Sequence, residues 1–302
     1  MLDELVRLLI EGKLYLFAGA GVSCLAGLPS WKKLLKEFAG GYEGLPNNDK
    51  NIVKELPALI ENCETVIIDH LLGLGTEGQR KYAEILKNTF RQDVCSDVHE
   101  WLIELPFAGY ITTNYDLCFE KACLKRNLKL NLIDGRRFCY PPHRFEHDAK
   151  NIRDLSGCEG PFLLHMHGCI EHNGKYDVDN IILTRRQYYD FYNKPEMDCI
   201  YDNCFYEHIL IVGTSFSDPY FMNKFKERRG HISATNIANR KKCYVLRHSS
   251  EMSKSPHSDE VSLDIVYAYF DDVIDAGLRN MINELRHAYM ERTSQVPMIV
   301  QE

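Results

Sequence analysis

The stretch LYLFAGAGVSCLAGLPSW, residues 14–31, decides the fold that we expect for this chain. Its apolar run Leu14–Phe17 is typical of a strand that is buried on both faces of a parallel sheet. The small residues of Gly19–Ser23 follow, where a phosphate group could approach the backbone, and a helix is expected to begin at Trp31. Cys24 occupies the place of the third glycine in G-x-G-x-x-G. The stretch by itself therefore leaves a nucleotide site and a plain tight turn both open.

The composition of the chain excludes several classes of protein. The 302 residues carry a net charge of −7 without a basic block, which disfavours a broad nucleic-acid surface. No apolar run approaches the roughly 20 residues that span a bilayer, and the amino terminus does not resemble a secretion signal. The odd number of cysteines, 11, indicates reduced thiols rather than a disulfide framework. We expect a cytoplasmic protein without membrane association.

Strands and helices are expected to alternate along the chain. An amphipathic helix is predicted at residues 2–11, and Ser30 is the predicted N-cap of a helix that runs to about Phe38. The later strands are predicted at Ala108–Thr113, Phe162–Met166, Ile181–Leu183, Ile209–Val212, Cys243–Leu246 and Ile265–Phe270. The later helices are predicted at Leu117–Leu124 and Arg185–Tyr192, from Asp218-Pro219, and from Ile274. This alternation predicts an α/β fold with a Rossmann-like parallel sheet.

Residues 41–105 interrupt the alternation between the first strand and the second. They look mostly helical, and a simple β-α-β crossover would be far shorter, so we interpret them as an inserted helical layer or subdomain. Breaks are expected at glycine and proline positions, namely Gly40–Gly41, Pro46, Pro57 and Gly73–Gly78. We expect one domain over residues 1–292, followed by a tail at 293–302.

Polar residues follow four of the predicted strands. They are Gly19–Ser23, Asn114–Asp116, His167 and Gly213–Ser215. In an open parallel sheet, the carboxyl ends of the strands line the ligand crevice. One such turn means little, but four of them together favour a nucleotide site.

Metal chemistry is the main alternative for the histidines. His165, His167 and Cys169 alternate, so a continuing strand would place them on one side. Gly168 is expected to end that strand, and a fourth ligand is not evident. We therefore expect no metal. The sequence also contains neither G-x-S-x-G nor a Walker turn.

Five motifs, in this order, resemble the sirtuin-like domains of bacterial NAD-cleaving defence proteins. They are FAGAGVS with GLPSW (17–31), ITTNYD (111–116), HMHG (165–168), ILT with Tyr188, and VGTSFSDP (212–219). The resemblance covers residues 17–221, most of the chain. It implies a Rossmann-like domain that uses NAD.

Two departures from the protein deacylases of the wider superfamily favour NAD hydrolysis. Those enzymes hold a structural zinc with two C-x-x-C pairs, and this sequence contains no C-x-x-C, so no zinc ribbon is expected. Where the deacylases usually read G-x-P-D-F-R, this chain reads GLPSWK at residues 27–32.

The resemblance also implies roles for individual residues. Asn114 would contact the ribose and the attacking water, and Asp116 would accept from the nicotinamide carboxamide. His167 would be the general base, a role that an ordinary pKa near 6.5 suits. The residues implied to bind NAD are Gly19, Ala20, Gly21, Ser23, Pro29, Trp31, Thr113, Asn114, Asp116, Gly213, Thr214, Ser215 and Asp218.

We therefore expect an NAD glycohydrolase that releases nicotinamide and ADP-ribose and depletes NAD in antiphage defence by abortive infection. The resemblance implies a homo-oligomer that is activated by assembly, by a ligand or by a second protein, for which a defence ATPase is one candidate. Two alternatives stay open. One is an NAD-dependent deacylase or ADP-ribosyltransferase, and the other is a non-catalytic module that binds NAD or ADP-ribose.

Overall fold

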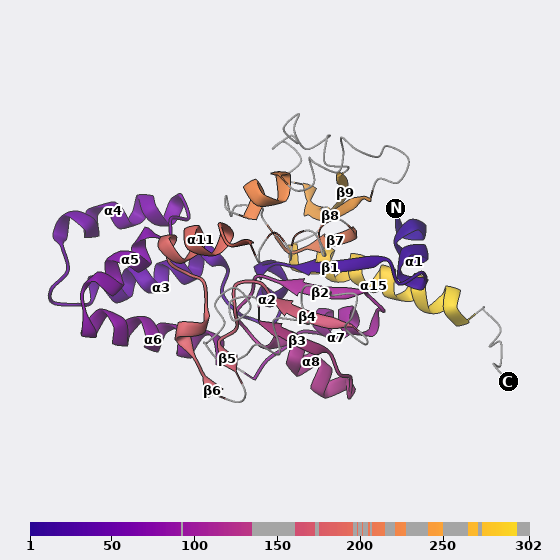
Figure 1. Cartoon of the computed structure of the whole chain (residues 1–302), viewed down its shortest axis with the longest axis horizontal. Coiled ribbons are helices and arrows are strands. Elements are labelled where there is room, and N and C mark those ends of the chain that lie inside the picture. Colours follow the sequence, from indigo (N-terminus) through magenta and orange to yellow (C-terminus); the bar gives the residue numbers. More distant parts are fainter. Residues whose placement is uncertain are drawn as a thin grey trace.

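The sheet at the centre of the molecule is parallel throughout and has the order β3-β4-β2-β1-β7-β8-β9 (Figure 1). The computed structural model describes residues 1–91, 93–134, 161–172, 175–195, 198, 201, 205, 207–214, 221–227, 241–249, 265–270 and 274–294. The strands of the sheet are β1 (Leu14–Ala18), β2 (Gly109–Thr112), β3 (Asn131–Asp134), β4 (Phe162–His165), β7 (His208–Val212), β8 (Cys243–His248) and β9 (Ile265–Phe270). The predicted Rossmann-like α/β fold is confirmed.

Helices and aromatic side chains cover the two faces of this sheet. One face packs against the helices α1 (Leu2–Ile10), α7 (Asp97–Glu104), α8 (Cys118–Arg126) and α15 (Ile274–Ser294). The other face packs against α11 (Arg185–Tyr192) and a group of buried aromatic rings. The central strand β1 serves both cores, because Leu16 faces the first and Phe17 the second. Burial on both faces explains why this strand is an unbroken apolar run.

Four helices after β1 form a separate layer beside the sheet (Figure 1). They are α3 (Trp31–Glu43), α4 (Lys50–Glu61), α5 (Val66–Gly73) and α6 (Thr76–Phe90). They share their own core, which includes Leu35, Phe38, Ile68 and Leu86. The expected helical layer is therefore present, whereas α7 packs on the sheet like an ordinary crossover helix. The division into domains stays a prediction.

Two of the predicted helix breaks are wrong. Helix α3 continues through Gly40–Gly41, where a Cβ on Gly41 would lie 2.8 Å from Cδ1 of Ile85. A glycine here lets α6 pack closely, and burial of the α3 face outweighs the low helix propensity of glycine. Helix α4 continues through Pro57, held by the burial of Leu56 against the same core. Ser30 is the N-cap of α3, as predicted, and its Oγ accepts from the Lys33 N–H at 3.4 Å.

Three further predictions need correction. Residues 181–183 form no strand, because only Ile181 pairs, in a single bridge to Gly168. The expected turn after β1 is the short helix α2 (Ala20–Cys24). The edge strand β3 lies where no strand was predicted. The short elements in the described residues include the hairpin β5 (Glu171–His172) with β6 (Lys175–Tyr176) and the 3-10 turn η2 (Val178–Asn180). The predicted helix start at Asp218-Pro219 lies outside the described residues.

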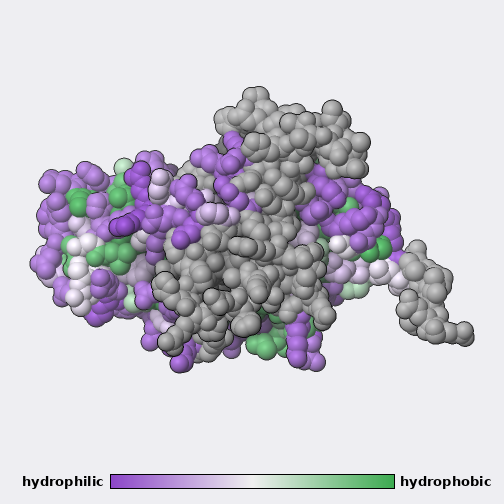
Figure 2. Space-filling view, in the orientation of Figure 1, coloured by the Kyte–Doolittle hydropathy of each residue, from purple (hydrophilic) through white to green (hydrophobic). Residues whose placement is uncertain are grey.

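Hydrophilic residues cover most of the described surface in the view of Figure 2, with smaller hydrophobic areas between them. Among the large apolar side chains, Leu124 of α8 and Leu132 of β3 are the most exposed in the described part, at 74% and 63%. Across the described ranges, no helix has the length and apolar character needed to cross a membrane.

Candidate active site

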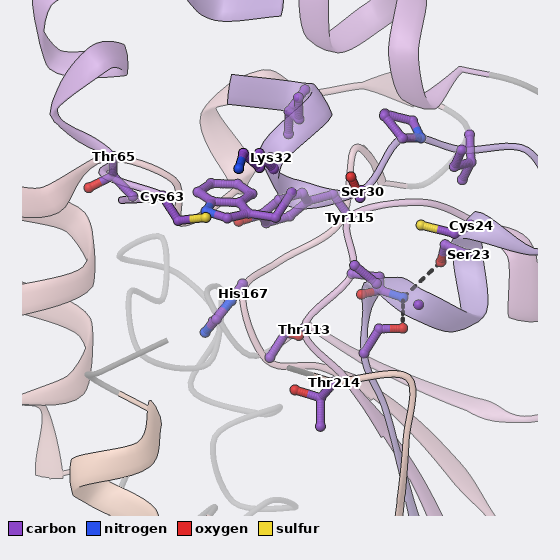
Figure 3. A pocket seen from close by; sticks show the side chains of 18 of the residues that line it. Ser23, Cys24, Ser30, Lys32, Cys63, Thr65, Thr113, Tyr115, His167 and Thr214 are labelled. Carbon is purple, nitrogen blue, oxygen red and sulfur yellow. Dashed lines mark hydrogen bonds between the residues drawn. The ribbon is translucent and has the colours of Figure 1, made fainter. Parts of the chain in front are cut away.

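A pocket of about 1020 Å³ lies at the carboxyl ends of β1, β2, β4 and β7. The neighbouring strands β1 and β7 flank the point where the strand order reverses, which is where open α/β sheets bind ligands. Figure 3 shows Lys32, Cys63 and Thr65 on the wall formed by the helical layer and Ser23 on α2. The pocket is therefore a cleft between the sheet and the α3–α6 layer.

The sequence predicted most of the sheet side of this pocket. Every predicted site residue within the described ranges lines it, namely Gly19, Ala20, Gly21, Ser23, Pro29, Trp31, Thr113, Asn114, Asp116, His167, Gly213 and Thr214. Ser215 and Asp218 lie outside the described residues. The four polar segments that follow separate strands thus reach one cavity, as the parallel topology requires.

The glycines after β1 allow two loops to touch each other. The N–H of Gly19 donates to the carbonyl of Val212 at 2.8 Å, and that of Gly21 donates to the carbonyl of Gly213 at 2.7 Å. A Cβ on Gly21 would lie 2.8 Å from the Cα of Gly213. Two N–H groups that we expected to face a phosphate are therefore used within the protein. The glycines join the β1 and β7 loops into one floor.

Asn114 presents its side-chain oxygen to the pocket. Its Nδ2 donates to the Gly19 carbonyl at 3.0 Å and to Ser23 Oγ at 2.8 Å, and its backbone N–H donates to Thr112 Oγ1 at 3.0 Å. A backbone carbonyl only accepts, so the amide nitrogen must face Gly19. Both amide hydrogens are then occupied. Oδ1, which accepts no hydrogen bond from the described residues, is left for a ligand.

Asp116 completes a buried chain of hydrogen bonds. Its Oδ2 accepts from Ser23 Oγ at 2.7 Å, and its Oδ1 accepts from the Cys118 N–H at 3.0 Å at the start of α8. Ser23 therefore accepts from Asn114 and donates to Asp116, which gives the chain one direction. Asp116 is only 5% exposed, so its carboxylate holds α2, α8 and Asn114 in register.

Replacement of Ser23 by alanine is expected to lower the free energy of unfolding by about 1–3 kcal/mol, because Asn114 Nδ2 and Asp116 Oδ2 each lose a buried hydrogen-bond partner. Urea denaturation at neutral pH measures this loss. Thr113→Val is the matched control: this pocket hydroxyl has no hydrogen bond to the described residues, so its loss should change stability by less than about 0.5 kcal/mol. Equal losses of stability in the two variants would contradict the stabilising role of the hydrogen bonds that link Asn114, Ser23 and Asp116.

His167 lies in an aromatic environment that the sequence did not predict. It is 2% exposed, its Nε2 lies 2.6 Å from the hydroxyl of Tyr192, and Tyr188 and Phe191 stand edge-on to its ring. Burial lowers the pKa of His167 to about 3. The premise of an ordinary pKa near 6.5 is therefore wrong, and the imidazole is neutral at pH 7.

The helical layer contributes a wall of the pocket that was not predicted from the sequence. Cys63, Glu64 and Thr65 from the α4–α5 connection line the pocket together with Phe90. The sequence of residues 41–105 contains no recognisable chemical motif, and only the packing of the layer brings the α4–α5 connection over the strand ends. Arg185 at the start of α11 is a further lining residue.

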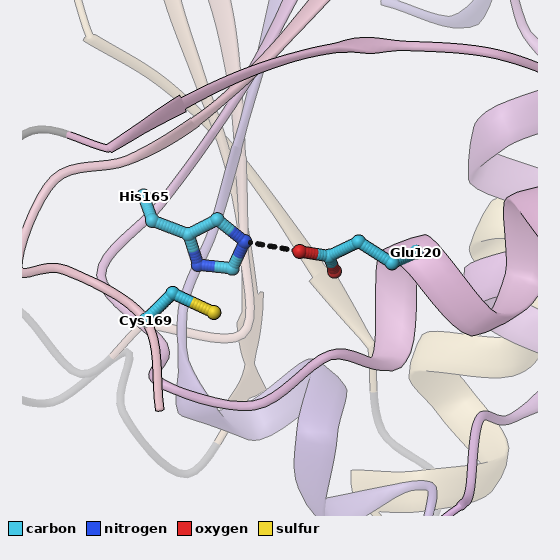
Figure 4. Close-up of side chains that lie close together, drawn as sticks. All are labelled: Glu120, His165 and Cys169. Carbon is cyan, nitrogen blue, oxygen red and sulfur yellow. Dashed lines mark hydrogen bonds and ion pairs between the residues drawn. The ribbon is translucent and has the colours of Figure 1, made fainter. Parts of the chain in front are cut away.

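One group of possible metal ligands is present in the described residues. Glu120, His165 and Cys169 place a carboxylate oxygen, a ring nitrogen and a sulfur within 4.8 Å of one another (Figure 4). His167 is not part of it and contacts Tyr192 instead. His165 and Glu120 are already joined by a hydrogen bond of 2.9 Å.

The doubly wound parallel sheet with a pocket at its switch point defines a Rossmann-like ligand-binding domain. Residues 108–264, just over half of the chain, match the family described as the SIR2-like domain. The chain belongs to this family.

Known relatives align over about seven tenths of the chain. The defence-associated sirtuin 2 of Bacillus subtilis is 25% identical over 214 residues, which are 69% of this chain and 18% of that protein. The NAD(+) hydrolase ThsA of Bacillus cereus (strain MSX-D12) is 26% identical over 222 residues, 72% of this chain and 40% of that protein. The NAD(+) hydrolase ThsA of Cytobacillus dafuensis is 24% identical over 238 residues, which are 76% of this chain and 41% of that protein. The chain thus spans about a fifth to two fifths of the length of these relatives.

Proposed function

We propose that this chain cleaves NAD into nicotinamide and ADP-ribose. The observation that carries the proposal is the fixed orientation of Asn114, whose Oδ1 is available at a pocket that His167 also lines. Relatives named NAD(+) hydrolase ThsA align across this region and support the choice of substrate and reaction.

The bond between nicotinamide and ribose breaks through an oxocarbenium-like state, by analogy with glycoside hydrolysis. Oδ1 of Asn114 would accept a hydrogen bond from a ribose hydroxyl or from the attacking water, which holds the water on one face of the sugar. Neutral His167 can accept a proton from that water, although its low pKa makes it a weak base before substrate binds. Asp116 would accept from the carboxamide with the lone pairs that Ser23 and Cys118 leave free.

The pyrophosphate would lie over the joined loops of β1 and β7. Gly19–Ser23, Gly213 and Thr214 form this floor, and Ser215 and Asp218 stay predicted members of it. Trp31 and Pro29 line the pocket where the helical layer meets α2, and we assign them to the same ligand. Lys32 and Arg185 supply positive charge along the wall.

The biological role that we propose is NAD depletion in antiphage defence. The name of the Bacillus subtilis relative, a defence-associated sirtuin, supports this role. Unregulated NAD cleavage would kill the host cell, so the activity would be released by a second protein, a ligand or self-assembly. A cytoplasmic homo-oligomer is part of the proposal.

Nicotinamide release is the direct test. The purified full chain is incubated with NAD, alone and together with the product of the neighbouring gene, and nicotinamide is quantified. His167→Ala is expected to lower the rate by about 10²-fold or more, whereas His287→Ala, on the exposed face of α15, leaves it unchanged.

Three outcomes would overturn the proposal. One is no nicotinamide in any assembled state, with NAD bound but not turned over. Another is NAD loss that occurs only with turnover of an acyl-lysine peptide. The third is an unchanged rate in His167→Ala.

A further inference from the structure

A buried histidine, His165, has no role in the proposed reaction but contacts the backbone of Asn114. His165 ends β4 and is 3% exposed. Its Nδ1 lies 3.0 Å from the carbonyl oxygen of Asn114, and its Nε2 lies 2.9 Å from Oε1 of Glu120 in the first turn of α8 (Figure 4). One imidazole therefore spans the distance between α8 and the peptide that follows Asn114.

The two hydrogen-bonding partners of His165 determine where its ring carries hydrogen. The carbonyl of Asn114 only accepts, so Nδ1 of His165 must carry a hydrogen and donate it. Nε2 and Glu120 then share one further proton, which lies on the imidazolium or on the carboxylic acid. In either arrangement the bond to Asn114 is retained, and Glu120 sets the direction of the ring.

The charges around the ring favour this protonation. Burial lowers the pKa of His165, but the charge and hydrogen bond of Glu120 outweigh that effect and raise the pKa to about 9, with help from the Asn114 carbonyl and Asp116. The sulfur of Cys169 also lies within 4.8 Å of the facing atoms of His165 and Glu120. The bond to Asn114 therefore persists at neutral pH.

We propose that His165, oriented by Glu120, is a positioning residue for Asn114, an inference that rests on the proposed function. The side chain of Asn114 is fixed by Gly19 and Ser23, and its backbone by Thr112 and His165. Without the bond to the carbonyl, the peptide can rotate and carry Oδ1 away from its place. A displacement of about 1 Å in such a group can lower a catalysed rate about 10²-fold.

Two substitutions of similar size separate this role from a structural one. His165→Gln places an amide near the former Nε2, so the bond to Glu120 is kept and the bond to Asn114 is lost. His165→Asn places an amide nitrogen near the former Nδ1, so the bond to Asn114 is kept. Because His165→Asn leaves Glu120 buried without its partner, the double variant with Glu120→Gln removes that charge.

Steady-state kinetics of NAD cleavage, under the conditions in which the wild type is active, give the decisive comparison. We expect kcat to fall about 10- to 100-fold in His165→Gln, with KM changed less than about threefold, and to stay within about threefold of the wild type in His165→Asn/Glu120→Gln. Melting temperatures should fall in both variants. Nitrogen-15 NMR of the wild-type ring, which needs no activity, should show a protonated Nδ1 at pH 7.

The failures of the two proposals are distinguishable. An inactive wild type in every assembled state overturns the proposed function, and the positioning role of His165 with it. An active wild type with equal kcat losses in both variants, or none in His165→Gln, overturns the positioning role alone. An unprotonated Nδ1 overturns it as well.

Discussion

Asn114→Ala is expected to lower the rate of NAD cleavage by about 10²- to 10³-fold, the size of effect seen when one preorganised polar contact to a reacting centre is removed. The substitution deletes Oδ1, the acceptor that we assign to the ribose and water. It also removes the Nδ2 donor that the Gly19 carbonyl and Ser23 Oγ share. NAD affinity should change by less than about tenfold, since a single hydrogen bond contributes about 1 kcal/mol. Single-turnover nicotinamide release and calorimetric binding measure the two quantities separately.

Two further variants define what the asparagine does. Asn223→Ala is the matched control, because this exposed asparagine also lines the pocket and has no assigned role. Asn114→Asp keeps the shape but sets a carboxylate oxygen against the carbonyl oxygen of Gly19, where no hydrogen is available. It should therefore lose both activity and about 1–3 kcal/mol of stability. An active Asn114→Asp enzyme would contradict the orientation of the amide.

Gly213→Ala is expected to lower the free energy of unfolding by about 2–5 kcal/mol, which combines an unfavourable backbone conformation with overpacking. Gly213 has a φ of +68°, and a Cβ there would lie 2.6 Å from the backbone nitrogen of Val22. The added methyl group would separate the β7 loop from α2. Chemical denaturation measures the loss, and NAD binding should weaken because the floor of the pocket opens.

Gly27→Ala separates the two contributions. Gly27 also has a positive φ, +89°, but a Cβ there would meet no heavy atom within 4 Å. Only the conformational penalty applies, so we expect a loss of about 1–2 kcal/mol and unchanged NAD binding. If Gly27→Ala proved as destabilising as Gly213→Ala, close contact between the two loops would not be the reason for glycine at 213.

Most of the sheet side of the site was predictable because it depends on local sequence. The apolar runs before Gly19 and before Gly213 predicted two strands of one parallel sheet, and parallel strands bring their carboxyl ends to one edge. Only the structure shows that the two strands are neighbours. Asn114 and His167 follow strands in the same way, and both line the pocket. The roles that the resemblance implies for them stay predictions.

Features that depend on long-range packing were not predictable. Glycine propensity indicated a break at Gly40–Gly41, but the close approach of Ile85 requires a small residue inside a continuous helix. Among the described residues, the edge strand β3 pairs with β4 alone, and its Leu132 is exposed. Its sequence, NLID, offers just two consecutive apolar residues, too short a run to predict a strand.

The amino-acid sequence alone indicated where most strands lie along the chain and which small or polar residues end them, because strand propensity and turn chemistry are local properties. The orientation and the protonation of the side chains at those strand ends depend on the tertiary structure. Asn114 is oriented by Gly19, 95 residues away in the sequence, and His167 is neutral because aromatic side chains of α11 exclude water from it. Hydrogen-bond direction and desolvation arise from contacts between distant segments, and no local pattern encodes them.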